Sequence, residues 1–287
     1  MSKGDGKPEL LASYWTICGN AIPATGPEYS SFDFRDRVEA ISRIGFNGMG
    51  IWHADLYKTL ESRSLAEMRQ ILDDNGIEHV ELEFLFDWFL DGEKKKQSDL
   101  EKARLLDAAE ALHARHLKVG DFFNTPTTVE KCAESFAVLC HDAANAGIDV
   151  VFELMPFAMI DNLEDSLTML EMADTPNGGL MIDTWHMVKM GVSNETLAQV
   201  PGKHVLGVEL NDGWLQTPHG MDMNTETTQH RQFCGEGEFD MDGLLAAIRS
   251  IGYDGPYGVE VISKANRSLP LDVVAQKAWD TTMAQFA

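Results

Sequence analysis

The sequence predicts an α/β fold in which eight parallel strands alternate with eight helices and close into a single (β/α)8 barrel. Three observations lead to this prediction. Apolar runs of strand length alternate with amphipathic runs of helix length along the whole chain. The 287 residues are an ordinary length for one such barrel. The first predicted strand is not followed by the GxGxxG turn that an open doubly wound sheet would usually show.

In the first half of the chain, capping residues mark where the predicted helices begin. Asp33 precedes one helix and Ser64 begins the next, with Gly76 just past the end of the second. We interpret the segment DGEKKKQS, residues 91–98, as a charged loop. The predicted strands are 10–17, 46–52, 77–84 and 116–119, and the predicted helices are 34–44, 64–75, 99–114 and 129–146.

The second half repeats this alternation. The predicted strands are 148–153, 180–183, 205–210 and 256–262, and the predicted helices are 163–173, 194–199, 241–251 and 271–286. The segment 211–238 is too long for a minimal connection, which indicates a functional or interfacial loop. It contains His219, His230 and Arg231. No linker interrupts the pattern, so we predict one domain over residues 1–287.

Composition narrows the class of protein. Hydrophobic residues make up 44% of the chain, enough for a large core. We find no apolar run that could span a membrane and no signal peptide in the opening MSKGDGKPEL. Cys18, Cys132, Cys140 and Cys234 form no CxxC pair, which favours reduced thiols. These features predict a cytoplasmic protein without a membrane partner.

The charge of the chain argues against nucleic acid as a partner. The formal net charge is −23, from 23 basic and 46 acidic residues. A surface this acidic repels phosphate backbones. A small anionic substrate remains compatible with it, because a bound cation and a nearby arginine can reverse the field locally.

Four apolar runs in the second half each end in a carboxylate, and in a barrel the carboxyl ends of the strands form the active site. These acids are Glu153, Asp183, Glu209 and Glu260. Converging carboxylates repel one another, and a divalent cation removes that repulsion. Oxygen ligands suit Mn²⁺ or Mg²⁺ better than Zn²⁺. The alternative for any single acid is a helix cap or a salt bridge at the rim.

Several segments resemble the sugar isomerases and epimerases related to xylose isomerase, a family of TIM barrels. The matching segments are FELMP around Glu153, MIDTWHMVKMG around Asp183 and His186, VELND around Glu209, and RQFCGEGEFDMDGLLAAIRSIGYDGPYGVEV from Arg231 to beyond Glu260. The resemblance is most specific between residues 150 and 261.

The resemblance implies a role for each of these residues. Glu153 and Glu260 would bind the metal and act as the acid/base pair, and Asp183 would be a further ligand. His186 and Arg231 would bind substrate oxygens. Many relatives carry histidine where this chain has a glutamate on the seventh strand. Glu209 would make the ligand set all-carboxylate, although whether it binds the metal directly stays open.

The chemistry that this arrangement suits is proton abstraction next to a carbonyl. A metal chelated by the substrate stabilises the enediolate, and a carboxylate moves the proton. Return of the proton gives an epimer or an isomer, whereas loss of a β-group gives an eliminated product. We therefore predict a metal-dependent isomerase or epimerase of a keto sugar or related polyol.

The alternative is a lyase on the same scaffold, such as an inosose- or dehydroshikimate-type dehydratase or a 3-keto-glycoside β-eliminase. A nuclease is disfavoured by the acidic charge and the few histidines at the rim. A non-catalytic barrel is a further alternative, and it predicts no metal at the acids.

Other residues near predicted strand ends are secondary candidates. We expect His53 and Glu83 to bind substrate hydroxyls, and we assign Lys118 to barrel packing or rim salt bridges. Trp88 and Phe89 are candidates for a lid or for a contact between copies of the chain. The second alternative implies a homo-oligomer.

Overall fold

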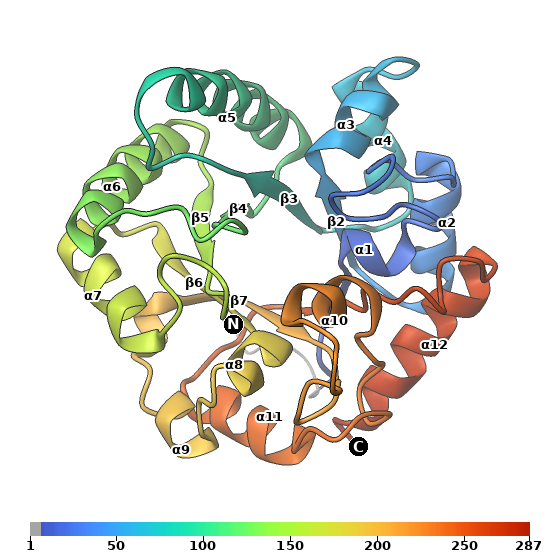
Figure 1. Ribbon diagram of the computed structural model, residues 1–287. Helices are drawn as coiled ribbons and strands as arrows, with labels where there is room; N and C mark the ends of the chain where they lie inside the picture. The colour runs from blue at the N-terminus through green and yellow to red at the C-terminus, as the bar shows by residue number, and fades with distance from the viewer. Residues whose placement is uncertain (1–6) are drawn as a thin grey trace.

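Eight parallel strands pair in chain order, and the last strand pairs with the first to close a barrel (Figure 1). The structure is a computed structural model that describes residues 7–287, so the first six residues of the predicted domain lie outside the described part. The predicted barrel is confirmed. The strands are β1 (Leu10–Ala12), β2 (Gly48–Trp52), β3 (His79–Leu85), β4 (His116–Val119), β5 (Asp149–Glu153), β6 (Gly178–Asp183), β7 (Val205–Leu210) and β8 (Tyr257–Val259).

Helices surround the barrel on all sides (Figure 1). They are α1 (Tyr14–Ile17), α2 (Phe34–Ile44), α3 (His53–Leu60), α4 (Leu65–Asp74), α5 (Gly92–Leu112), α6 (Val129–Asn145), α7 (Leu163–Ala173), α8 (Thr184–Lys189), α9 (Asn194–Leu197), the 3-10 turn η1 (Gly202–His204), α10 (Met223–Gln229), α11 (Met241–Ser250) and α12 (Leu271–Ala284). The expected caps are present, since Asp33 accepts from the Arg35 N–H and Ser64 forms a capping box with Glu67.

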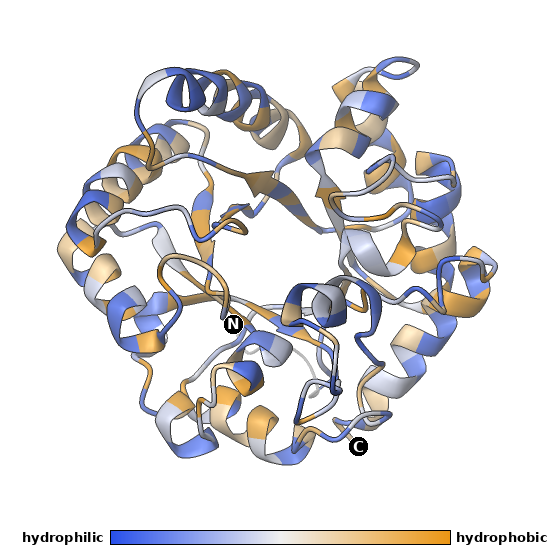
Figure 2. Cartoon of the chain, in the orientation of Figure 1, coloured by the Kyte–Doolittle hydropathy of each residue, from blue (hydrophilic) through white to orange (hydrophobic). Residues whose placement is uncertain are grey.

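The main core lies between the strands and the surrounding helices. Strand residues such as Val80 and Val150 pack there against helix residues such as Leu105 and Phe136, all fully or almost fully buried. Figure 2 shows polar and apolar residues alternating around these helices. Since each helix buries only one stripe of its surface, the amphipathic pattern of the sequence is the pattern of a helix covering a sheet.

The register of the strands brings charged side chains to neighbouring positions. Asp183 on β6 pairs with Glu209 on β7, and Glu83 on β3 pairs with Lys118 on β4. Next to Glu209 on β8 is Gly258, where an added Cβ would lie 2.8 Å from the Glu209 Cγ. Glycine at this position therefore makes room for the buried glutamate.

Two predicted boundaries are wrong. The first strand ends at Ala12, and residues 14–17 form the helical turn α1 instead of continuing it. The charged segment 91–98 is not a loop, because α5 begins at Gly92 and runs through it. Lysine and glutamate are good helix formers, and charge alone does not separate an exposed helical turn from a loop.

The prediction of a lid or intermolecular role for Trp88 and Phe89 is also wrong. Their side chains are 3% and 0% exposed and belong to the main core. Trp88 packs edge-on against Phe136 and Phe152, with ring centroids 5.9 and 6.3 Å away. Both residues therefore attach the segment after β3 to the barrel.

Two general expectations can be compared with the described residues. No helix within residues 7–287 combines the length and the apolar character needed to cross a membrane. Cys18, Cys132, Cys140 and Cys234 are free thiols in the structure, and all four are buried.

Candidate active site

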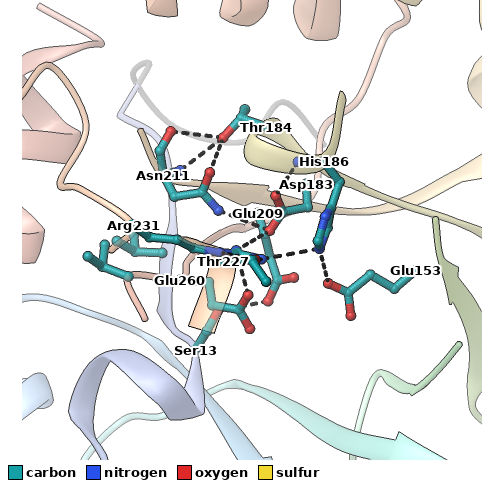
Figure 3. A network of polar contacts seen from close by, with 12 residues as sticks. Ser13, Glu153, Asp183, Thr184, His186, Glu209, Asn211, Thr227, Arg231 and Glu260 are labelled. Carbon is teal, nitrogen blue, oxygen red and sulfur yellow. Dashed lines mark hydrogen bonds and ion pairs between the residues drawn. The ribbon is translucent and has the colours of Figure 1, made fainter. Parts of the chain in front are cut away.

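Four acids converge at the carboxyl ends of β5 to β8. Glu153, Asp183, Glu209 and Glu260 each offer one oxygen, and these oxygens all lie within 4.8 Å of one another (Figure 3). All four side chains are buried. Because each residue lies within one position of the carboxyl end of one of four consecutive parallel strands, the barrel brings them together.

Asp183 has a second role as the N-cap of α8. Its Oδ1 accepts a hydrogen bond from the His186 backbone N–H at 3.1 Å. The helix that starts there directs the imidazole back into the acid cluster (Figure 3). The His186 Nε2 lies 3.3 Å from Glu153 Oε1 and 3.1 Å from Arg231 Nη2. One strand end thus positions both a carboxylate and a histidine.

Arg231 reaches the same acids from the long segment after β7. Its Nη1 donates to Asp183 Oδ2 at 2.7 Å and to Glu260 Oε2 at 2.8 Å. Its Nε and Nη2 donate to the Thr227 hydroxyl on α10, at 3.1 and 2.9 Å. The side-chain amide of Asn211 also donates to Asp183, at 2.9 Å. The guanidinium is therefore held in a fixed plane against two of the acids.

Lys118 enters the cluster from β4. Its Nζ lies 2.7 and 2.8 Å from the two carboxylate oxygens of Glu209, and the Ser13 hydroxyl donates to the first of these oxygens at 2.9 Å. Glu83, Glu260 and Glu153 follow at 3.3, 3.6 and 3.8 Å. Lys118 is buried in the barrel and forms salt bridges, as expected, and its partners include the clustered acids themselves.

Two of the four acids are held in the ionised form. Burial alone would raise the pKa of Glu153, but Lys118 and His186 bring it below its ordinary value. Burial likewise opposes ionisation of Asp183, and the neighbouring Arg231 lowers its pKa below the usual range. Both carboxylates are therefore ready to accept a cation or a proton donor at neutral pH.

The other two acids, Glu209 and Glu260, have pKa values above the ordinary value of a glutamate. Burial raises the pKa of Glu209 well above its ordinary value, and the adjacent Glu260 adds to this rise while Lys118 opposes it. Burial also raises the pKa of Glu260, against the influence of Lys118 and Arg231. Lys118 and Arg231 thus offset only part of the rise in pKa that burial causes at these two carboxyl groups.

The donor set fits a divalent metal ion. Four buried carboxylates with converging oxygens, two of them with raised pKa values, are the arrangement that an added cation stabilises. Glu153, Asp183 and His186 form a second combination, in which one ligand atom of each lies within 4.8 Å of the others. Oxygen donors dominate both sets, as expected for hard cations, while the imidazole leaves Zn²⁺ compatible.

Glu83 lies beside this cluster, whereas His53 belongs to an aromatic group. Burial raises the pKa of Glu83 to about 7, and its closest cation is Lys118. The His53 Nδ1 accepts from the Phe84 backbone N–H at 3.3 Å. Its ring lies 4.7 Å from that of Trp52, between centroids. Among the described contacts, none joins His53 to the four acids.

Sequence reasoning missed several residues that organise the site. Asn211 could have been found, because it lies two residues after Glu209 and alternate residues of a strand face the same side. Thr227 gave no such signal, since α10 lies within a segment that the sequence showed only as a long loop. Lys118 was visible at a strand end, but its closest partner, Glu209, comes from β7, which is not a neighbour of β4.

The fold and this site define a barrel with a candidate metal centre at its catalytic end. The family described as the xylose isomerase-like TIM barrel matches residues 38–281. The protein belongs to this family, and the predicted resemblance is confirmed.

Similar proteins include a dehydratase and an isomerase. The 3-dehydroshikimate dehydratase of Pseudomonas aeruginosa is 27% identical over 246 residues, covering 82% of this chain and 37% of that protein. The inosose isomerase of Bacillus velezensis is 25% identical over 154 residues, or 53% of each. This chain therefore matches about a third to a half of these relatives. A crystal structure of the IOLI protein with a binding zinc atom has a TM-score of 0.84 at 20% identity, covering 97% of this chain and 98% of that one, which shows the shared fold.

Proposed function

We propose that the protein is a metal-dependent isomerase or epimerase of a keto sugar or related polyol. The observation that carries the proposal is the convergence of four buried acids within 4.8 Å, with Glu153 and Glu260 among them. The similarity to an inosose isomerase supports the substrate class. A divalent cation bound there would polarise the substrate carbonyl and acidify the neighbouring C–H bond.

The residues of the chain divide the remaining work. Glu153 and Glu260 are the proposed acid/base pair, one accepting the proton from carbon and the other returning a proton. Arg231 lies between Asp183 and Glu260, where it can offset the negative charge that develops on a substrate oxygen. His186 is placed to bind a second substrate oxygen. Burial of the whole set excludes water and strengthens each of these interactions.

A lyase is the second candidate, because the similarity to a 3-dehydroshikimate dehydratase extends over 82% of this chain. The first step is the same removal of a proton next to a carbonyl. A hydroxyl on the β-carbon then leaves as water, so a C–H and a C–O bond break and a C=C bond forms. The returned proton goes to the leaving oxygen instead of to carbon.

Deuterium exchange separates these functions. The protein is incubated in D₂O with Mn²⁺ or Mg²⁺ and with keto sugars, inososes or 3-dehydroshikimate, and the products are read by mass spectrometry. An isomerase or epimerase gives deuterated product with the formula of the substrate, whereas a dehydratase gives product that has lost water. The chelated, metal-free protein is the control. No exchange with any of these compounds, or full exchange after complete chelation, would contradict the proposal.

A further inference from the structure

Lys118 is the residue whose place is least explained by the proposed chemistry. Its side chain is 1% exposed, and its Nζ is within 4 Å of four different carboxylates. Among these it is closest to Glu209, where it lies 2.7 and 2.8 Å from the two oxygens. A buried lysine is costly unless it is paired, so the surrounding acids are part of what holds it there.

The two buried cations divide the acids between them. Arg231 bonds to Asp183 and Glu260, but no contact joins it to Glu209 among the described residues. Lys118 donates a hydrogen bond to Glu209, and the Ser13 hydroxyl donates a further one to the same carboxylate. Both oxygens of Glu209 are thus engaged by groups of the chain itself, and Lys118 contacts each of them.

This arrangement gives the pair a definite electrostatic effect. The Lys118 Nζ contacts both oxygens of Glu209, and with Glu209 ionised the carboxylate and the ammonium together carry no net charge. A cation bound by the other acids then meets less negative charge than four unpaired carboxylates would provide. The ammonium also lies 3.6 Å from Glu260 and 3.8 Å from Glu153, close enough to repel a metal ion bound there.

We propose that Lys118 and Glu209 act as one neutral pair that limits how strongly the site binds a cation and favours divalent over trivalent ions. Lys118 is in this sense a positioning residue, since it acts on the metal through the acids. The proposal rests on the proposed metal site and adds the residue that sets its charge. If Lys118 served packing alone, an apolar side chain of similar length would replace it without effect on the metal.

The first test is Lys118→Met, with binding of Mn²⁺ measured by calorimetry and of Tb³⁺ by luminescence. We expect roughly tenfold tighter Mn²⁺ binding or more, the size of effect that one neighbouring charge has on an ionisation. The gain for Tb³⁺ should be larger, because repulsion from the ammonium grows with the charge of the ion. Unchanged or weaker binding of both ions in a folded variant would overturn the proposal.

A double-mutant cycle keeps the test decisive if Lys118→Met does not fold. Glu209→Gln leaves the lysine without its nearest acid and should weaken Mn²⁺ binding by roughly tenfold. Combining the two changes removes the pair, so the double variant should bind Mn²⁺ more tightly than Glu209→Gln alone. Equal or weaker binding by the double variant contradicts the proposal.

A matched control and the wild-type protein complete the design. Lys102→Met removes one charge from a half-buried lysine that pairs with Asp142 on α6, outside the site, and should leave both affinities unchanged. Thermal unfolding of each variant shows whether it folds. If the wild-type protein binds no Mn²⁺, the proposed metal function fails. If it binds Mn²⁺ and Lys118→Met has no effect, only the role of Lys118 fails.

Discussion

Glu153 and Glu260 are both buried glutamates, but their surroundings shift their pKa values in opposite directions. Lys118 and His186 oppose the effect of burial at Glu153 and keep its pKa low. At Glu260, burial dominates and the pKa is raised. A pair of carboxyl groups whose pKa values are pushed apart is a common arrangement for an acid and a base. The direction of these shifts favours Glu153 as the base and Glu260 as the proton donor.

Removing either carboxylate should stop the reaction without unfolding the protein. Glu153→Gln and Glu260→Gln keep the shape of the side chain, but an amide can neither accept nor donate the proton, so we expect turnover to fall by about 10²–10⁴-fold or more. Steady-state kinetics with the substrate found by deuterium exchange measures the loss, and circular dichroism checks the fold. Near-normal turnover in both variants would rule out the assigned roles.

The site residues differ in how far the sequence could predict them. Asp183 and Glu260 were accessible because an apolar run leading to an acid has few interpretations in a barrel. Lys118 was not, because its importance depends on which strands lie next to one another across the barrel interior. His53 was predicted to bind substrate, a prediction that no contact to the acids supports so far.

At the scale of elements, the segment between β7 and α11 determines how Arg231 is held. Within it, α10 carries Thr227, which accepts two hydrogen bonds from the guanidinium. The helix is attached by a buried ion pair, with Lys189 Nζ 2.7 Å from Glu226 Oε1. The same Nζ donates to the Trp214 carbonyl at 2.6 Å. A short helix of seven residues is thus fixed by tertiary contacts.

Breaking this ion pair should loosen α10 locally. Glu226→Gln leaves Lys189 buried and unpaired, which we expect to cost about 3 kcal/mol of local stability. Hydrogen exchange of residues 223–229 should accelerate, and KM should rise because Arg231 is held less firmly. The control is Glu61→Gln at the exposed Lys58–Glu61 pair, with a cost of about 0–1 kcal/mol. Unchanged exchange in α10 would show that the pair is not its anchor.

Most elements were predictable because their signals are local. The bounds of α2, α7 and β7 match the prediction, since caps and periodicity mark them directly. The helices α3 and α8 were missed because each begins where a strand ends, without a separating turn. In such places the barrel geometry, more than the local sequence, decides where the helix begins.

At the scale of the whole molecule, the interior of the barrel carries an unusual amount of charge. Below the site, Glu81 lies 3.2 Å from His116, and both are buried. Burial raises the pKa values of Glu81 and Glu83 to about 7 and lowers that of His116 well below its ordinary 6.5. The folded protein therefore holds protons that the unfolded chain would release.

These shifts predict how stability depends on pH in the absence of metal. Acids with raised pKa values bind more protons in the folded state, so their contribution is lost as pH rises through the folded pKa of about 7. Above 6.5 the buried histidine opposes this change only weakly, because it is neutral in the folded state and already more than half neutral in the unfolded chain. The melting temperature of the metal-free protein should therefore fall between about pH 6.5 and 8.

Divalent metal should reverse this trend, because it binds the deprotonated carboxylates. A concentration of about 100 times Kd stabilises a folded protein by about 2.7 kcal/mol. Scanning calorimetry with and without Mn²⁺ measures both effects. A metal-free melting temperature that rises over this range would contradict the assigned shifts.

The two halves of the barrel contribute unequally to the charges that meet at the site. The strands β5 to β8 bring the four clustered acids, and Arg231 follows β7, whereas Lys118 comes from β4 and Ser13 directly follows β1. A fragment containing only the second half would gather the four acids with Arg231 but without Lys118. The two halves meet at both seams, where β4 pairs with β5 and where β1 pairs with β8. The first seam brings Lys118 to the acids and the second brings Ser13 to Glu209, so the contacts of the cluster are complete only in the closed ring.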